Sequence, residues 1–178
     1  ADELANFDYG SYQIPFNSDS GFYSDFARLP YQVPLNNAVD YQNYLKILAS
    51  WPLFVEQQIS HMKSGLERGM TQPEEILDNI PSTITAFITT NPLLSVFYQP
   101  FNNFPKSITM EQRKLLIEQA KKLIVEAIFP GYKKIADFME KEYIPAARKN
   151  LGASELPNGV NYYAQRVKHF TTLDLSID

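Results

Sequence analysis

The sequence predicts an all-α protein, an irregular array of several helices that follows an extended, loop-rich N-terminal segment. Two observations support this fold class. From residue 37 onward, apolar residues recur at the three- and four-residue spacing of amphipathic helices. Prolines, glycines and capping residues divide the same region into separate segments. With 178 residues, of which 44% are hydrophobic, the chain is long enough to bury one full core.

The pattern divides the chain after residue 36. Residues 1–36 mix aromatic residues with turn formers, so we expect an irregular segment with short extended pieces near Tyr12–Phe16 and Tyr31–Val33. Residues 37–178 form the helical region. We expect this region to be part of a larger domain that continues beyond residue 178.

Two helices are predicted between residues 37 and 69. The apolar residues on one face of the first are Tyr41, Tyr44, Leu45 and Leu48. We expect Pro52 to end this helix and to begin the next, because proline has no N–H to donate within a helix. The apolar stripe of the second helix consists of Val55, Ile59, Met62 and Leu66, and Gly69 is the expected C-terminal cap.

The middle of the chain contains two capping pairs. Thr71 with Glu74 predicts the start of a third helix, and four prolines then divide residues 80–106 into short pieces. Thr109 with Gln112 predicts the start of the longest helix. The residues expected on its buried face are Leu116, Ala120, Leu123 and Ala127.

Proline also marks the predicted ends of the later helices. Pro130-Gly131 is expected to break the longest helix, and Pro145 to kink the one that follows, which ends at Leu151-Gly152. A last helix follows the loop at residues 153–159. The residues expected on its buried side are Val160, Tyr163, Ala164 and Val167. Ser176 is placed as an N-cap with no helix after it, so we expect the chain to stop within a longer protein.

Composition excludes several classes of function. The net charge is −4, with 16 basic and 20 acidic residues, so no nucleic-acid partner is expected. The absence of cysteine excludes disulfides, thiolate nucleophiles and cysteine ligands to zinc. The two histidines, His61 and His169, have no His or Glu three or four residues away, so we expect no metal ligands and no cofactor in this chain. No catalytic residue is predicted either.

One group of polar residues on the last helix is a candidate binding site. Tyr162, Arg166 and His169 are spaced four and three residues apart, on a different face from the apolar stripe. A phenol, a guanidinium and an imidazole in this order could hold a carboxylate or carbonyl of a ligand. The alternative is an ordinary half-exposed face that packs Tyr162 and solvates the other two side chains, and spacing alone favours that alternative.

Several blocks of the sequence resemble the bacterial domain of unknown function 885 family. Their order and spacing, from about residue 25 to the last residue, carry the likeness more than any single block. The blocks are Asp40-Tyr41-Gln42-Asn43-Tyr44-Leu45, residues 63–73, Phe97-Tyr98-Gln99-Pro100-Phe101, residues 138–148, Gly152, Leu156-Pro157-Asn158-Gly159, Tyr162-Tyr163-Ala164 and Thr171-Thr172-Leu173-Asp174-Leu175.

This resemblance implies a long bacterial protein, often with a signal peptide or lipoprotein signal, and so a periplasmic or cell-envelope lipoprotein. Members are similar to helical zinc carboxypeptidases, and many carry an H-E-x-x-H helix downstream of the Thr-Thr stretch. Such a helix binds zinc through its histidines, and its glutamate activates the metal-bound water. Because this sequence stops before that point, zinc is implied only for the parent protein. The resemblance also implies that one segment leads into the substrate site, and its residues are Pro157, Gly159, Tyr162, Tyr163, Thr171 and Thr172.

Two hypotheses about function follow. In the first, the chain is a non-catalytic helical fragment of a zinc metallopeptidase-like hydrolase and lines or covers the substrate cleft of the parent protein. Its partners would be the remaining C-terminal part of the parent chain and a peptide substrate, and an exposed apolar surface could cause self-association. In the second, the chain is a self-contained helical binding or scaffold module of the bacterial cell envelope. A large exposed apolar face would favour the first hypothesis.

Overall fold

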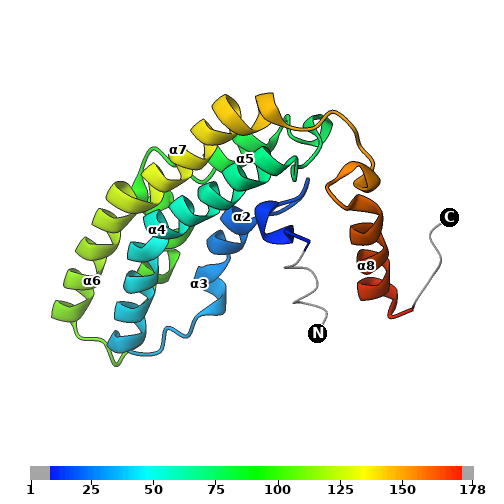
Figure 1. Cartoon of the computed structure of the whole chain (residues 1–178). Helices are drawn as coiled ribbons and strands as arrows, with labels where there is room; N and C mark the ends of the chain where they lie inside the picture. Colours follow the sequence, from blue (N-terminus) through cyan, green and yellow to red (C-terminus); the bar gives the residue numbers. More distant parts are fainter. Residues whose placement is uncertain (1–8, 174–178) are drawn as a thin grey trace.

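The computed structural model describes residues 9–173, and this part of the chain is mostly helical with no β-strand (Figure 1). The predicted all-α, multi-helix fold class is therefore confirmed. The α-helices are α2 (Phe22–Ala27), α3 (Leu29–Gln32), α4 (Ala38–Arg68), α5 (Ile80–Thr85), α6 (Met110–Leu123), α7 (Phe129–Phe138) and α8 (Gly159–Thr171). Short 3₁₀ turns lie between them at η1 (Ser11–Gln13), η2 (Glu74–Ile76), η3 (Pro92–Leu94), η4 (Val96–Asn102), η7 (Ile144–Ala146) and η8 (Ala153–Glu155).

Helix α4 runs through the centre of the molecule and contacts both α6 and α7. The Asn37 side chain caps its first turn by accepting hydrogen bonds from the backbone N–H groups of Val39 and Asp40. Gly69 ends the helix with φ = 73°, a left-handed conformation that favours glycine, as predicted.

The predicted helix break at Pro52 is wrong, because α4 continues through this residue. Pro52 lies on the exposed side of the helix. Its neighbours Trp51 and Val55 face the core and are completely buried. One uninterrupted helix keeps both side chains in the core, and this burial offsets the hydrogen bond that proline cannot donate.

The predicted break at Pro130-Gly131 is also wrong. A π-helical turn, η5 (Ile124–Ile128), joins α6 directly to α7, and Pro130 occupies the first turn of α7. The π-turn shifts the hydrogen-bond register just before Pro130, which has no N–H to donate. The helix therefore continues past this residue. The predicted capping box of α6 is confirmed, since Thr109 and Gln112 bond each other's backbone N–H groups.

A second π-helical turn, η6 (Met139–Tyr143), precedes Pro145. Here the helix ends in η7 and the backbone becomes extended at Ala147, so Pro145 terminates the helix rather than kinking it. The predicted end at Leu151-Gly152 was therefore too late. Proline restricts the conformation of the residue before it and has no N–H, and both properties favour an end at this point.

Two further expectations for the first half of the chain were wrong. Tyr31 belongs to α3 rather than to an extended piece, and α2 buries Phe22 and Tyr23 in the core. Thr71 does not cap a helix. Its hydroxyl accepts a hydrogen bond from the backbone N–H of Arg148 (3.1 Å), and only the 3₁₀ turn η2 follows, so the next α-helix begins at Ile80.

The core is built around aromatic rings from several elements. Trp51 of α4 stacks on Phe26 with a centroid distance of 4.1 Å and lies 4.9 Å from the ring of Tyr132 in α7. Buried tyrosine hydroxyls are satisfied by backbone carbonyls, as in the bond from Tyr132 to Tyr23 (2.7 Å) and from Tyr44 to Phe97 (3.0 Å). Burial raises the pKa of both tyrosines above the ordinary range.

Helix α8 does not pack as the sequence predicted. Figure 1 shows it set apart from the layer of α4, α6 and α7, and it contacts mainly η8. Val160, Tyr163 and Phe170 are 62%, 46% and 74% exposed, although two of them were expected on the buried side. These three residues, with the half-buried Val167, form the α8 apolar face. Their helical spacing was read correctly, but residues 9–173 contain no element that covers this face.

Candidate functional site

A cavity lies where α8 meets the body of the protein, and we call it the junction cavity. It has a volume of 480 Å³ and is lined by residues from four parts of the chain. Residues 11–25 and the Thr71-Gln72 pair form one side, and α8 with η8 forms the other. Tyr162 and Arg166 line the cavity from α8, and Arg148 lines it from the segment that follows η7.

Arg148 holds this junction together through backbone carbonyls. Its Nε donates to the carbonyl of Thr71 (2.9 Å), and its Nη atoms donate to the carbonyls of Asn150, Leu151 and Gly152. Burial lowers the pKa of the guanidinium, although an arginine stays charged in this environment. Within residues 9–173, no carboxylate lies within ion-pair distance of it.

The other polar groups of the cavity wall are fixed by their own hydrogen bonds. Gln72 donates from Nε2 to the carbonyl of Phe16 (2.6 Å), and its backbone N–H donates to the hydroxyl of Tyr143 (3.0 Å). Burial raises the pKa of Tyr143 to about 12, so this phenol stays neutral at physiological pH. The Asn17 side chain accepts bonds from the backbone N–H groups of Asp19 and Ser20. These contacts give the cavity wall a defined shape.

The structure brings together only part of the predicted binding group. Tyr162 and Arg166 both line the junction cavity, whereas Tyr163 and His169 do not. Tyr162 is half-buried and packs edge-on against Tyr9 with a centroid distance of 6.0 Å. The guanidinium of Arg166 lies over the Phe170 ring at 4.7 Å, and the imidazole of His169 meets the same ring at 5.3 Å.

Gly159 has a positional role at the start of α8. It is buried, and a Cβ built on it would lie 2.6 Å from the carbonyl carbon of Ser154 and closer still to the carbonyl oxygens of Ala153 and Ser154. Only glycine therefore allows α8 to approach η8 this closely. Because α8 contacts mainly η8, Gly159 determines how Tyr162 and Arg166 are presented to the cavity.

Arg148 and Gln72 were missed by the sequence interpretation. Both act through contacts between segments more than fifty residues apart, such as Arg148 with Thr71 and Gln72 with Phe16. Helical periodicity carries no information about such pairings. The one available signal was an arginine directly after a helix that ends at proline, and this pattern is too common to identify a site.

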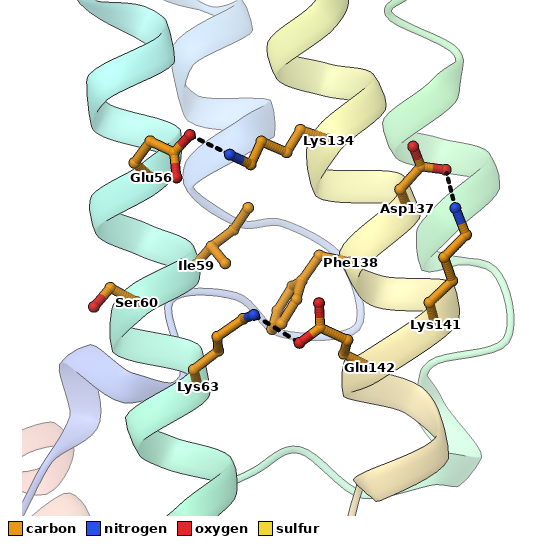
Figure 2. Close-up of a pocket in the computed structure, with 9 residues that line it drawn as sticks. All are labelled: Glu56, Ile59, Ser60, Lys63, Lys134, Asp137, Phe138, Lys141 and Glu142. Atoms are coloured by element: carbon orange, nitrogen blue, oxygen red, sulfur yellow. Dashed lines mark hydrogen bonds and ion pairs between the residues drawn. The ribbon is translucent and has the colours of Figure 1, made fainter.

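A second concave surface lies between α4 and the α7–η6 segment, and we call it the ion-pair groove (Figure 2). Figure 2 shows ammonium and carboxylate groups from the two sides pointing toward each other. Lys63 pairs with Glu142 (2.7 Å), Lys134 pairs with Glu56, and the floor is formed by Ile59 and Phe138. Since the lining contains three acids and three lysines, their fields cancel. We interpret this groove as a structural seam rather than a ligand site.

Asp137 at the edge of this groove should make stability depend on pH. Hydrogen bonds from Lys133 (3.1 Å) and Lys141 (3.2 Å) lower the pKa of its carboxyl group. A pKa that is lower in the folded state than in the unfolded state stabilises the folded protein above the unfolded pKa, and this contribution is lost as pH falls through the folded pKa.

We expect Asp137→Asn to reduce the loss of stability toward acid pH. The free energy of unfolding in urea, measured from neutral to acid pH, checks this. Glu140→Gln, which removes a neighbouring carboxylate that forms no ion pair with a described residue, is the control. An Asp137 pKa at its ordinary value, measured by NMR, would contradict the prediction.

Neither a metal cluster nor a membrane-spanning helix is found in the described part of the chain. No group of three or more His, Asp or Glu side chains in residues 9–173 could hold a metal ion. None of its helices is long and apolar enough to cross a membrane. The histidines lie on different helices, where His61 of α4 packs edge-on against Tyr12 and His169 lies on α8. The predicted N-cap at Ser176 lies outside the described residues.

Comparison with known proteins places the chain in a family. It matches a family of bacterial proteins of unknown function, DUF885, over residues 1–178. The chain belongs to this family. The resemblance drawn from the sequence blocks is thus confirmed, whereas no curated protein matches the chain.

The fold is also found in a solved structure. A crystal structure described as that of "the putative lipoprotein from Colwellia psychrerythraea" matches with a TM-score of 0.81 and 19% sequence identity. The match covers 92% of this chain and 28% of that protein. At this level of identity the likeness establishes a shared fold alone. This DUF885 chain spans only about 28% of the length of the Colwellia protein that it matches.

Proposed function

We propose that this chain is a non-catalytic helical part of a longer zinc metallopeptidase-like hydrolase of the DUF885 family, where it lines or covers the substrate cleft. The observation that carries the proposal is the exposed α8 apolar face, with Val160 62% and Phe170 74% exposed. An amphipathic helix normally buries such a face against a partner. The length of the matched Colwellia protein supports the remaining part of a longer chain as that partner.

The donor set of this chain does not fit a catalytic zinc ion. Such a site takes three protein ligands, and within residues 9–173 no three His, Asp or Glu side chains are grouped so that they could hold a metal ion, while the two histidines lie on separate helices, α4 and α8. In this proposal the zinc ligands and the catalytic glutamate therefore belong to the remaining part of the parent protein. No catalytic step is assigned to any residue of this chain.

The residues of α8 would contribute to substrate binding rather than to chemistry. Tyr162 and Arg166 line the junction cavity and would contact a peptide substrate there. Tyr163 belongs to the α8 apolar face and would contact the remaining part of the parent chain, with His169 at the edge between these two surfaces. Gly159 would set the position of the helix.

The proposal is tested on a longer DUF885 protein that contains both this region and an H-E-x-x-H motif. We expect bound zinc and peptide hydrolysis that a chelator abolishes. Replacing the motif's glutamate with glutamine should lower kcat by about 100-fold or more, because the metal-bound water loses its general base. A longer protein that binds no zinc, or that hydrolyses peptides equally well with chelator, would overturn the proposal.

The packing of α8 can be tested in the same protein. Phe170→Ser should destabilise the longer protein but leave the 178-residue chain nearly unchanged, because only the longer protein would cover this side chain. Leu94→Ser is a matched control, since Leu94 is 70% exposed and lies away from α8. Equal effects of Phe170→Ser in the two proteins would show that the longer protein does not cover the α8 apolar face.

The second candidate is a self-contained helical binding or scaffold module of the bacterial cell envelope. The observation that favours it is the core, which is well filled within the described residues, as Trp51, Tyr132 and Tyr143 show by their complete burial. The lipoprotein description of the Colwellia structure supports an envelope location, periplasmic or membrane-anchored, for both candidates. This candidate would be favoured if the 178-residue chain is a monomer and is as stable to unfolding as the longer protein. Self-association of the chain through the α8 apolar face would favour the first candidate.

A further inference from the structure

The four residues of the α8 apolar face follow a regular order along the helix. Val160, Tyr163, Val167 and Phe170 are separated by steps of three, four and three residues. At about 100° per residue, these side chains fall within a sector of about 80° and extend over about 15 Å of the helix axis. The next position along one edge is Ala164, whose small side chain allows a neighbour to approach closely. The α8 apolar face is therefore a narrow stripe that runs along the helix.

This spacing is the one by which two helices pack along their lengths. Apolar residues that alternate three and four residues apart form the a and d positions of a heptad, and each side chain inserts between four residues of a facing helix. In α8 the two valines occupy one of these positions and the two aromatic rings occupy the other. Smaller and larger side chains thus alternate along the stripe, which suits interdigitation with the side chains of another helix.

The body of the protein holds α8 in an orientation that leaves the stripe accessible. Gly159 packs the start of the helix against η8, and the Tyr162 ring packs edge-on against Tyr9. Tyr162 and Arg166, which line the junction cavity, lie about 100° around the helix from the centre of the stripe. Figure 1 shows α8 set apart from the layer of α4, α6 and α7. The helix is fixed on one side and presents the α8 apolar face on another.

The size of the stripe favours a partner from the same polypeptide over a second copy of the chain. Four partly exposed side chains, two of them aromatic, offer roughly 400 Å² for burial. A stable interface between separate molecules takes about 800 Å² from each partner. A segment of the same chain is held nearby by its covalent connection and does not need this area. The matched Colwellia protein has such chain to offer, since the match covers only 28% of it.

We infer that α8 pairs lengthwise with a single helix from the remaining part of the parent protein. The two helices cross at about 20°, the usual angle for this spacing, and α8 lies between its partner and the body of the protein. The inference rests on the proposed function only in that the chain is part of a longer protein. It deepens that function by naming the kind of element that covers α8.

Photo-crosslinking in a longer DUF885 protein that contains this region tests the inference. The photoreactive residue p-benzoylphenylalanine is placed at positions 160, 163, 167 and 170, one at a time, and the crosslinked residues are identified by mass spectrometry. We expect all four probes to reach one segment. Moving the probe from 160 to 170 should shift the crosslinked position by about ten residues, because both helices rise by about 1.5 Å per residue. A strand along α8 would give a shift of about four or five residues, at about 3.3 Å per residue.

Position 161 is the matched control for these probes. Asn161 is exposed in the first turn of α8 but lies outside the stripe, so a probe there should crosslink to this segment at less than about a tenth of the yield. Circular dichroism verifies the folding of each variant. If the probes at the two valines disturb the fold, Tyr163 and Phe170 decide, because both already hold aromatic rings. Between them a helical partner gives a shift of about seven residues and a strand about three.

Four results would each contradict the helix pair. They are the smaller shift expected of a strand, crosslinks scattered over several segments, crosslinks between two copies of the protein, and an equal yield from position 161. Zinc content and peptide hydrolysis play no part in this experiment. A longer protein without zinc can therefore still show the helix pair, and an active zinc peptidase can cover α8 with another kind of element, so the two proposals fail separately.

Discussion

Replacing Trp51 with alanine is expected to lower the free energy of unfolding by about 4 kcal/mol. The indole is completely buried and contacts aromatic rings from three separate segments, including Phe26 of α2 and Tyr132 of α7. Removing it leaves a cavity that rings held by rigid helices cannot fill. Equilibrium unfolding in urea, followed by circular dichroism, measures the change.

Leu53→Ala is the matched control for this prediction. Leu53 lies two residues away on α4 but is 64% exposed, so its truncation should change the free energy of unfolding by less than about 1 kcal/mol. Similar losses at positions 51 and 53 would show that α4 is not packed as described here.

Replacing Gly131 with alanine is expected to destabilise the protein by about 2 kcal/mol, although alanine favours helices by about 1 kcal/mol. A Cβ at this position would lie 2.5 Å from Cδ1 of Trp51 and closer still to Nε1. The indole cannot move away, since Phe26 stacks on it and Tyr132 packs beside it. Urea unfolding measures this effect as well.

Two further variants test this cause. Gly152→Ala should be nearly neutral, because its Cβ would meet the mobile hydroxyl of Ser154 at 3.2 Å and Cγ of Glu155 at an ordinary contact distance of 3.8 Å. Combining Gly131→Ala with Trp51→Phe should cost less than the sum of the two separate changes, since a smaller ring makes room for the methyl group. Strict additivity of the two changes would rule out the proposed clash.

Local signals in the sequence predicted the fold class and several helix boundaries. Gly69 and the Thr109 capping box were visible because caps are formed by residues close together in the chain. Pro52 and Pro130 were misread as breaks. Whether a proline interrupts a helix depends on what the flanking residues bury and on whether a π-turn forms, and both are decided by tertiary packing.

The candidate site was predictable only in part. The spacing of Tyr162 and Arg166 places them on one edge of α8, but their opposite wall comes from segments far away in the chain. The apolar stripe of α8 was recognised by its period, and its burial was assumed. Periodicity identifies a face that can be buried, but it does not tell which part of a protein covers that face.

The π-turn η5 has a consequence for how the α6–α7 rod meets α4. Six of the buried positions along this rod recur every four residues: Leu116, Ala120, Ile124, Ile128, Tyr132 and Ala136. In a regular α-helix a four-residue step overshoots one turn by about 40°, so such a row would spiral away from its neighbour. The additional residue in each π-turn takes up part of this angular drift. The phase of the buried row is thereby reset at η5, and Tyr132 stays directed at Trp51.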